Sequence, residues 1–374
     1  MIVNPVSGGV TLKEITQKIT LGNSIQLPDK YKPQDVLFFD IETTGFAPAT
    51  TILYLIGCVY YENDSYYITQ WFADTADAQT DVLSAFLSFT RKYKYLIHYN
   101  GNGFDIPYII KKCHLLKIEC DFSHIKSFDI YKEIQPLKTL LKLDNLKQKT
   151  IEQFLNINRE DRYSGGELIQ FYNNYLKSPD EQTLEILLLH NHDDIVGMTR
   201  ILPVLRYLNI LNGNYSFNDI TINDVKGSRE SKKEVTISLK LPKIVPVRIS
   251  YGKDSYYLTA YNDIVKICIN VYTEELKFFY PNYKDYYYLP EEDCALHKSV
   301  AFYVDKNFRT KAKAANCYSK KTGTFLPQIE EIIKPYFKIE YEDKITYFEY
   351  TEDFYRDGES IKKYCGHIIK YMER

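Results

Sequence analysis

A short apolar run that ends in two acidic residues is the feature that most constrains this chain. Residues 36–39 are apolar throughout and lead into Asp40, Ile41 and Glu42. Such a run predicts a buried strand, and residues two apart on a strand point to the same side. Asp40 and Glu42 would therefore bring two carboxylates to one spot. Carboxylates this close repel each other unless a cation lies between them, and oxygen ligands suit Mg²⁺ or Mn²⁺. A solvated strand end is the alternative for this motif taken alone.

A second polar motif, NGNGFDIPY at residues 100–108, joins a predicted strand to a predicted helix at 105–116. Its glycines permit a tight turn and the close approach of another backbone. Asp105 can act as the N-cap of this helix, with Pro107 in the first turn. A capping aspartate at a strand-to-helix turn is also well placed beside a metal ion, so both roles stay open.

A third motif, HNHDDI at residues 190–195, lies on a long predicted helix. His190 and Asp194 are four residues apart and therefore share one face of that helix. An acid and a base on this face would supply a further metal ligand and a group that activates water. A polar turn of a surface helix, or structural capping by Asp193, is the alternative.

The order of the predicted elements indicates an α/β domain. Three strands near residue 40, at 51–62 and at 66–72 form an antiparallel meander. Helix and strand then alternate, and helices follow at about 145–210. This is the order of a ribonuclease-H-like mixed sheet flanked by helices, which we expect over residues 34–211. Residues 1–33 are expected to form an N-terminal extension that lies over this domain.

The remainder of the chain has a different character. Residues 212–233 are rich in Asn, Gly, Ser, Asp and Lys and predict a linker. Alternating β-type runs at 234–290 predict a β-rich α+β domain over 234–374. We expect some helix near 294–304 and a closing helix at 359–373. The topology and role of this domain do not follow from the sequence.

Charge limits how the chain could hold a nucleic acid. The 374 residues carry a formal net charge of −2, so contact requires a local basic patch or metal ions. Residues 306–321 contain six Lys or Arg and no acid, and we expect Lys311 and Lys313 to contact nucleic acid. A solvated basic loop is the alternative. A protein partner could equally dock on this second domain.

Two further features concern the cellular setting. The seven cysteines include no pair with CxxC spacing, which argues against a zinc ribbon and fits reduced thiols. No uninterrupted apolar run approaches a membrane span, and the N-terminus has no signal-peptide pattern. We therefore expect a soluble cytoplasmic protein without membrane contact.

Taken in order, the three motifs resemble those of the DEDD superfamily of 3′→5′ exonucleases, and most closely its YprB-type ribonuclease-H-like branch. The resemblance covers about residues 34–215 and extends to Arg159 and the SGGE segment at 164–167. It implies that the chain hydrolyses phosphodiester bonds at single-stranded DNA or RNA ends with two Mg²⁺ or Mn²⁺ ions. The four acids that it assigns to the metal site are Asp40, Glu42, Asp105 and Asp194.

One position departs from the family pattern. Proofreading members carry a tyrosine four residues before the last aspartate, or a histidine five residues before it. Here His190 stands four before Asp194, and Leu189 stands five before. His190 is nevertheless the candidate for activating the attacking water, with His192 a weaker one.

The motifs also predict contacts with the terminal nucleotide, with the Phe46 ring as a stacking surface. The residues that position places there are Thr43, Gly45, Phe46, Asn100, Asn102 and Phe104. Two other functions stay open. One is a structure-specific endonuclease on the same fold, and the other is a non-catalytic nucleic-acid-binding or scaffold protein that retains the fold.

Overall fold

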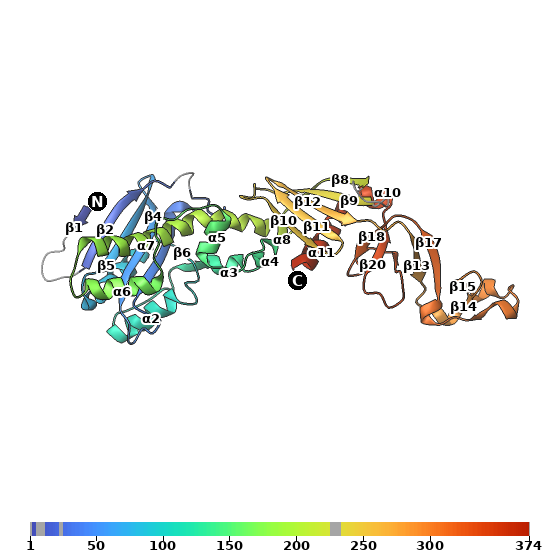
Figure 1. Cartoon of the computed structure of the whole chain (residues 1–374), viewed down its shortest axis with the longest axis horizontal. Helices are drawn as coiled ribbons and strands as arrows, with labels where there is room; N and C mark the ends of the chain where they lie inside the picture. The colour runs from blue at the N-terminus through green and yellow to red at the C-terminus, as the bar shows by residue number, and fades with distance from the viewer. Residues whose placement is uncertain (1, 5–11, 22–24, 225–232, 374) are drawn as a thin grey trace. The chain divides into compact units, whose positions relative to one another are not determined.

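The computed structural model describes residues 2–4, 12–21, 25–224 and 233–373. The chain divides into two compact units. The first comprises Met1–Lys138 and Leu143–Leu205, and the second comprises Thr139–Lys142 and Arg206–Arg374. Each unit has its own sheets, which Figure 1 shows.

The first unit is built on a seven-stranded mixed sheet with the order β1-β2-β5-β4-β3-β6-β7. Strand β3 runs parallel to β6 and antiparallel to β4, and β6 runs parallel to β7. The strands are β1 (Ile2–Asn4), β2 (Leu12–Ile19), β3 (Val36–Thr43), β4 (Leu53–Glu62), β5 (Ser65–Ala73), β6 (Tyr95–His98) and β7 (Lys126–Asp129).

Helices cover both faces of this sheet. The Phe39 ring packs on Phe86 of α1 at 5.3 Å, whereas the neighbouring Asp40 contacts Asn191 of α7. Consecutive residues of a strand point to opposite faces, so α1 and α7 lie on opposite sides. The helices are α1 (Gln79–Thr90), α2 (Asp105–Leu116), α3 (Ile130–Ile134), α4 (Leu137–Leu140), α5 (Gln148–Phe154), α6 (Gly165–Tyr175) and α7 (Glu181–Ile201), with 3-10 turns η1 (Pro33–Asp35) and η2 (Ala76–Ala78).

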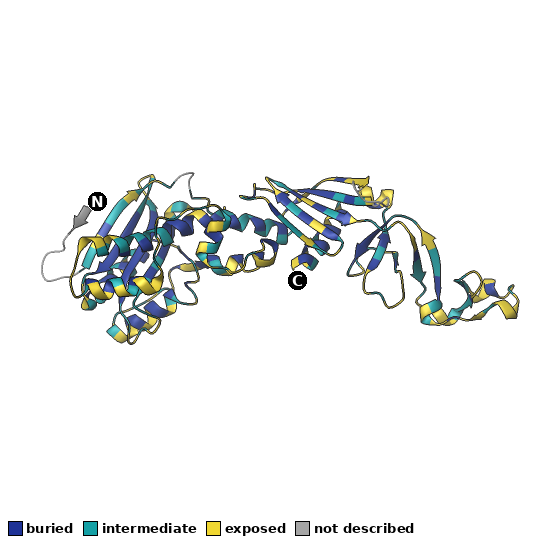
Figure 2. Ribbon diagram, in the orientation of Figure 1, coloured by how far each residue is buried: buried dark blue, intermediate teal, exposed yellow. Residues whose placement is uncertain are grey.

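Gly57 on β4 allows α7 to approach the sheet closely. A Cβ atom added there would lie 2.0 Å from Oδ1 of Asn191 and 2.4 Å from Cδ1 of Ile195. No side chain fits in that space, so the glycine sets the distance between helix and sheet. The buried strands and the inner faces of the helices form the core, which Figure 2 shows in dark blue.

The N-terminal segment differs from the expected extension. Residues 12–19 form β2, which pairs with β5 along its whole length, from Leu12 opposite Ala73 to Ile19 opposite Tyr66. In addition, Nε1 of Trp71 donates a hydrogen bond of 3.0 Å to Glu14. This strand continues the sheet beyond β5 and does not lie over the domain. Its sequence, LKEITQKI, carries mixed polarity because one side of the strand is only partly buried.

The second unit is β-rich with short helices, the α+β character that the sequence predicts. Its largest sheet has five strands in the order β10-β11-β12-β9-β8. These are β8 (Ser216–Asp224), β9 (Lys233–Lys240), β10 (Ile249–Lys253), β11 (Tyr256–Tyr261) and β12 (Ile264–Asn270). Figure 1 shows α11 (Gly358–Glu373) beside this sheet, and helix α8 (Leu208–Leu211) contacts α11.

Three smaller sheets complete the second unit: β13 with β17, β15-β14-β16, and β18-β20-β19. Their strands are β13 (Glu275–Phe279), β14 (Tyr286–Leu289), β15 (Cys294–His297), β16 (Thr310–Lys311), β17 (Tyr318–Thr322), β18 (Phe325–Gln328), β19 (Tyr336–Phe337) and β20 (Thr346–Glu349). The remaining helices and turns are η3 (Leu202–Tyr207), η4 (Tyr283–Asp285), α9 (Lys298–Ala301), η5 (Lys306–Phe308), η6 (Ala314–Asn316) and α10 (Glu352–Arg356).

Two expectations for this region were wrong in part. Much of the expected linker at 212–233 is strand β8, which pairs with β9 and buries Ile220; residues 225–232 lie outside the described part. The helix expected near 294–304 is short, because residues 294–297 form β15 opposite β14 and only Lys298–Ala301 is α-helical. All seven cysteines are free thiols. Within the described ranges, no helix has the length and apolar character needed to cross a membrane.

Candidate active site

The two strand acids lie on β3, the strand of the first sheet that pairs with both β4 and β6. Oδ2 of Asp40 accepts a hydrogen bond of 3.2 Å from the Asn191 side chain of α7. Oε1 of Glu42 is fully buried and has no hydrogen-bond partner among the described residues. A buried carboxylate oxygen without a partner is costly, so this atom calls for a donor or a cation.

Helix α7 brings the third motif to these acids. Nε2 of His190 lies 3.4 Å from Oδ2 of Asp194 and 3.9 Å from Oε1 of Glu42. One ligand atom from each of Glu42, His190 and Asp194 falls within 4.8 Å of the others. The close helix-to-sheet packing at Gly57 makes this approach possible.

The second motif reaches the same place from a neighbouring parallel strand. Because β3 and β6 are parallel, their carboxyl ends meet at one edge of the sheet, and the 100–105 loop follows β6. The carboxylate of Asp105 accepts a hydrogen bond from the backbone N–H of Ile41, between the two strand acids. Asp105 is the first residue of α2, with Phe104 at the N-cap position. The structure thus brings all four predicted acids together.

Burial and mutual repulsion disfavour the charged forms of Asp40, Glu42 and Asp105. Burial, followed by the charges of the neighbouring acids, holds the pKa of Asp40 and of Glu42 well above the usual range. Burial also raises the pKa of Asp105 to about 7, although two backbone N–H donors oppose the shift. A divalent cation would reverse this effect, because it neutralises the charges that repel. The clustered hard oxygen donors, with the orphaned oxygen of Glu42 among them, fit Mg²⁺ or Mn²⁺.

The sequence did not reveal Asp161 as a partner of His190. Its Oδ2 lies 2.8 Å from Nδ1 of His190, and its side chain is only 1% exposed. Burial opposes ionisation, but the N–H of Tyr163 and the charge of His190 hold the pKa of Asp161 below its usual value. Asp161 lies in a loop 29 residues before His190, so no spacing rule connects the two.

Helix α7 itself anchors this loop. Oδ2 of Asp193 accepts hydrogen bonds of 2.9 Å from the backbone N–H groups of Glu160 and Asp161. Burial opposes the effect, but contact with His192 and these two donors lowers the pKa of Asp193 to about 2. Asp193 therefore caps backbone N–H groups, as one sequence interpretation suggested, but those of the loop at 160–161.

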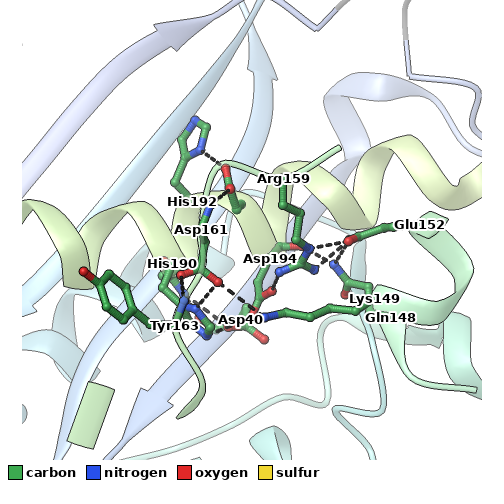
Figure 3. A network of polar contacts seen from close by, with 12 residues as sticks. Asp40, Gln148, Lys149, Glu152, Arg159, Asp161, Tyr163, His190, His192 and Asp194 are labelled. Carbon is green, nitrogen blue, oxygen red and sulfur yellow. Dashed lines mark hydrogen bonds and ion pairs between the residues drawn. The ribbon is translucent and has the colours of Figure 1, made fainter. Parts of the chain in front are cut away.

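Arg159, in the same loop, connects the last metal-site acid to α5. Its guanidinium donates to both carboxylate oxygens of Glu152 and to Oδ1 of Asp194, and Figure 3 shows it between these acids. Gln148 adds hydrogen bonds of 2.9 Å to Glu152 and 2.7 Å to the backbone carbonyl of Asp194. This network holds Asp194 through Oδ1 and the backbone carbonyl, whereas Oδ2 is the oxygen near His190.

The residues predicted to contact the terminal nucleotide lie at the end of β3, in the loop that follows it and in the loop between β6 and α2. Oγ1 of Thr43 donates 2.9 Å to the carbonyl of Gly45. Gly45 has φ +153°, and a Cβ atom there would meet Thr51 at 2.9 Å. The ring of Phe46 is 88% exposed, and its centroid lies 5.7 Å from that of Phe104 in an edge-to-face arrangement. Phe46 thus presents a free aromatic face.

The two asparagines of the second loop have structural contacts. Their backbone N–H groups donate to the carboxylate of Asp129, at 2.9 Å from Asn100 and 3.3 Å from Asn102. Oδ1 of Asn102 also accepts a hydrogen bond of 2.8 Å from Ser127. Lys311 and Lys313 belong to the second unit, where both are exposed.

Comparison with known proteins agrees with the fold. Residues 37–206 match a family model described as the RNase_H superfamily. Together with the mixed sheet and its flanking helices, this match makes the segment a ribonuclease-H-like domain, and the fold supports a nuclease. No curated protein sequence matches the chain.

This chain spans about half or less of the length of three solved structures that it resembles. The family B DNA polymerase from the hyperthermophilic archaeon Pyrobaculum calidifontis is 13% identical, with a TM-score of 0.35, over 68% of this chain and 35% of the polymerase. A structure of exonuclease I is 10% identical, with a TM-score of 0.31, over 55% of this chain and 54% of that one. The E. coli exonuclease I complex with a 5cy-dA13 oligonucleotide has the same identity and score, over 56% and 55%.

Proposed function

We propose that this protein is a metal-dependent 3′→5′ exonuclease that hydrolyses phosphodiester bonds of single-stranded DNA or RNA. The observation that carries the proposal is the convergence of four acids from three separate segments on one partly buried cluster beside His190. Repulsion makes such a cluster unfavourable without cations, so it is not expected in a protein that merely retains the fold. The motif order supports the 3′→5′ exonuclease class.

The four acids would hold two Mg²⁺ or Mn²⁺ ions: Asp40, Glu42, Asp105 and Asp194. When bound, such ions polarise the scissile phosphate and lower the pKa of an attacking water. The cluster is suited to such ions, because ligand atoms of Glu42, His190 and Asp194 lie within 4.8 Å of one another and Oε1 of Glu42 has no hydrogen-bond partner among the described residues. Arg159 and Asn191 orient Asp194 and Asp40 through hydrogen bonds.

His190 would act as the general base, in a tautomer that Asp161 fixes. If Nδ1 carries the proton, it donates to Asp161 at 2.8 Å and Nε2 keeps a free lone pair. Nε2 faces the acid cluster, where the attacking water would lie, and can accept its proton. This arrangement supports the role of a base for the histidine despite its position four residues before Asp194.

The exposed ring of Phe46 would receive the terminal base. It is exposed and packs edge-to-face on Phe104, the residue directly before Asp105. A base stacks on an aromatic ring without regard to its identity, which suits an enzyme that degrades any sequence. Asn100 and Asn102 would support this contact through the loop that they hold together.

Cleavage of end-labelled single-stranded DNA and RNA in Mg²⁺, Mn²⁺ or EDTA tests the proposal. We expect loss of activity in EDTA and in the Asp40→Asn and Asp194→Asn variants. Asp144→Asn, a change at an exposed acid of the same unit, is the matched control and should stay active. Cutting of circular substrates would instead indicate an endonuclease. Binding without cleavage under every condition would indicate a non-catalytic protein.

A further inference from the structure

The second unit contains an aromatic groove that lies outside the acid cluster. The groove has a volume of about 920 Å³, near the upper end of the range for ligand sites. It is bounded by β13, by the turn at 280–283, by η6 and by the segment around β19. Six aromatic rings line it, and none of the described residues that line it is acidic; the rings belong to Phe278, Phe279, Tyr280, Tyr283, Tyr336 and Tyr341.

Ring-to-ring contacts hold the walls of this groove in place. Phe279 packs edge-to-face on Tyr318 at 5.2 Å and on Tyr341 at 5.3 Å. Tyr280 stacks on Tyr286 at 4.5 Å. Tyr283 and Tyr341 nevertheless stay 36% and 38% exposed, so each retains a surface for a ligand. Aromatic faces held in this way bind planar groups at a small cost in conformational entropy.

The groove also carries positive charge. Lys334 and Lys338 line it, and neither has an acidic partner among the described residues. Ala314 lines the groove as well, next to the exposed Lys313. The basic segment at 306–321 therefore contributes Ala314 to the wall of the groove.

The paired and unpaired lysines of that segment separate along the chain. Lys320 forms an ion pair of 2.5 Å with Asp293, and Lys321 forms one of 2.6 Å with Glu349. Lys311 and Lys313 are exposed, and the described residues offer them no ion pair. Lys311 and Lys313, the lysines of the segment nearest Ala314 in sequence, are therefore available to a polyanion, as is the exposed Lys306.

We propose that the groove binds unpaired nucleotides of single-stranded DNA or RNA, with bases stacked on the tyrosines and phosphates near Lys334 and Lys338. Aromatic rings beside lysines are the combination by which proteins hold single strands without sequence preference. A proline-rich peptide would use the rings but would not need the lysines, so the charge favours a nucleic acid. The inference rests on the proposed function only in that such a nuclease must hold single strands.

Binding without cleavage tests the groove. The full chain carrying Asp40→Asn, in EDTA, would be titrated into 5′-fluorescein dT20 and rU20 and followed by anisotropy. Adding Tyr283→Ala and Tyr341→Ala should raise Kd at least about 5-fold, as expected for the loss of one stacked base. Tyr355→Ala, at an exposed tyrosine of α10, is the matched control. Comparison of the DNA and RNA probes identifies the preferred sugar.

Two further variant pairs separate binding from folding. Tyr341→Phe should keep the affinity, whereas Tyr341→Leu, with similar bulk but no aromatic face, should lose it. Lys334→Ala with Lys338→Ala should reduce the slope of log K against log salt by about 1.4, at about 0.7 for each phosphate contact. Lys266→Ala, at an exposed lysine that does not line the groove, should reduce it less.

Unchanged oligonucleotide affinity and salt slope in both groove double variants would overturn the inference. If the same variants instead lose affinity for a decaproline peptide while their oligonucleotide affinity is unchanged, the groove is a peptide site and the inference is also overturned. The result does not depend on cleavage. An inactive protein whose groove variants bind poorly would refute only the proposed nuclease, and an active one whose groove variants bind normally would refute only the groove.

Discussion

Replacement of Asp105 by asparagine should stabilise the metal-free protein at neutral pH and above. Burial is the main cause that raises the pKa of Asp105 from its ordinary value of 3.8 to about 7, and the charges of Asp129 and Asp194 add to it. As pH rises above about 4, the unfolded chain releases this proton before the folded chain does. The free energy of unfolding therefore falls between pH 4 and 7 and stays low above pH 7.

The size of the effect follows from the two pKa values. Their difference, from 3.8 to about 7, corresponds to about 4 kcal/mol at about 1.4 kcal/mol per pH unit. Asparagine stays neutral and avoids this cost. Asp105→Asn should thus gain about 1 kcal/mol over the natural chain at pH 4.5 and about 4 kcal/mol at pH 8. In saturating Mg²⁺ the stability difference between the variant and the natural chain should shrink or change sign, because only the natural chain keeps all four metal-binding acids.

Urea unfolding in EDTA, followed by tryptophan fluorescence, measures this difference. The chain has one tryptophan, Trp71, which is buried on β5, so the signal reports the first unit alone. Asp144→Asn removes an exposed carboxylate from the same unit and should leave stability nearly unchanged. A gain that does not depend on pH, or a variant less stable than the natural chain at pH 8, would refute the reasoning.

Three other predictions concern the site and its support. Asp161→Asn should lower kcat about 10- to 100-fold with little change in KM, because it removes the carboxylate that fixes the His190 ring; equal losses in both constants would argue against an orienting role. Phe46→Ala should raise KM for single strands about 5-fold and leave kcat almost unchanged, as steady-state cleavage rates would show. Gly57→Ala should lower the free energy of unfolding of the first unit by about 1–3 kcal/mol, because its Cβ atom would overlap α7, whereas Gly166→Ala, with open space around it, should not.

The parts of the fold that local patterns encode were predictable. The apolar run of β3, the meander through β5 and the helix over 105–116 each follow from a periodicity within a few residues. The four acids were recognisable because each stands at a strand end or on a helix face, in a fixed order. Their convergence follows from the parallel pairing of β3 with β6 and from the packing of α7 on β3 and β4.

What could not be predicted depends on contacts between distant segments. Strand β2 carries mixed polarity, and its pairing with β5 on one side and β1 on the other makes it a strand. Strand β8 lies in an Asn- and Asp-rich stretch that resembles a loop, and β9 supplies its hydrogen bonds. The pairing of His190 with Asp161 depends on a loop that Asp193 holds against α7. None of these contacts leaves a local pattern in the sequence.

The most direct test of the account is a cleavage time course on a single-stranded 20-mer labelled at its 5′ end, with Mg²⁺ and with EDTA. The account predicts a ladder of labelled products that shortens stepwise from the 3′ end, present only with the metal and absent in Asp194→Asn. The 3′-labelled strand should release a labelled mononucleotide first. Cleavage that persists in EDTA or in Asp194→Asn, or internal cuts that also open a circular strand, would contradict it.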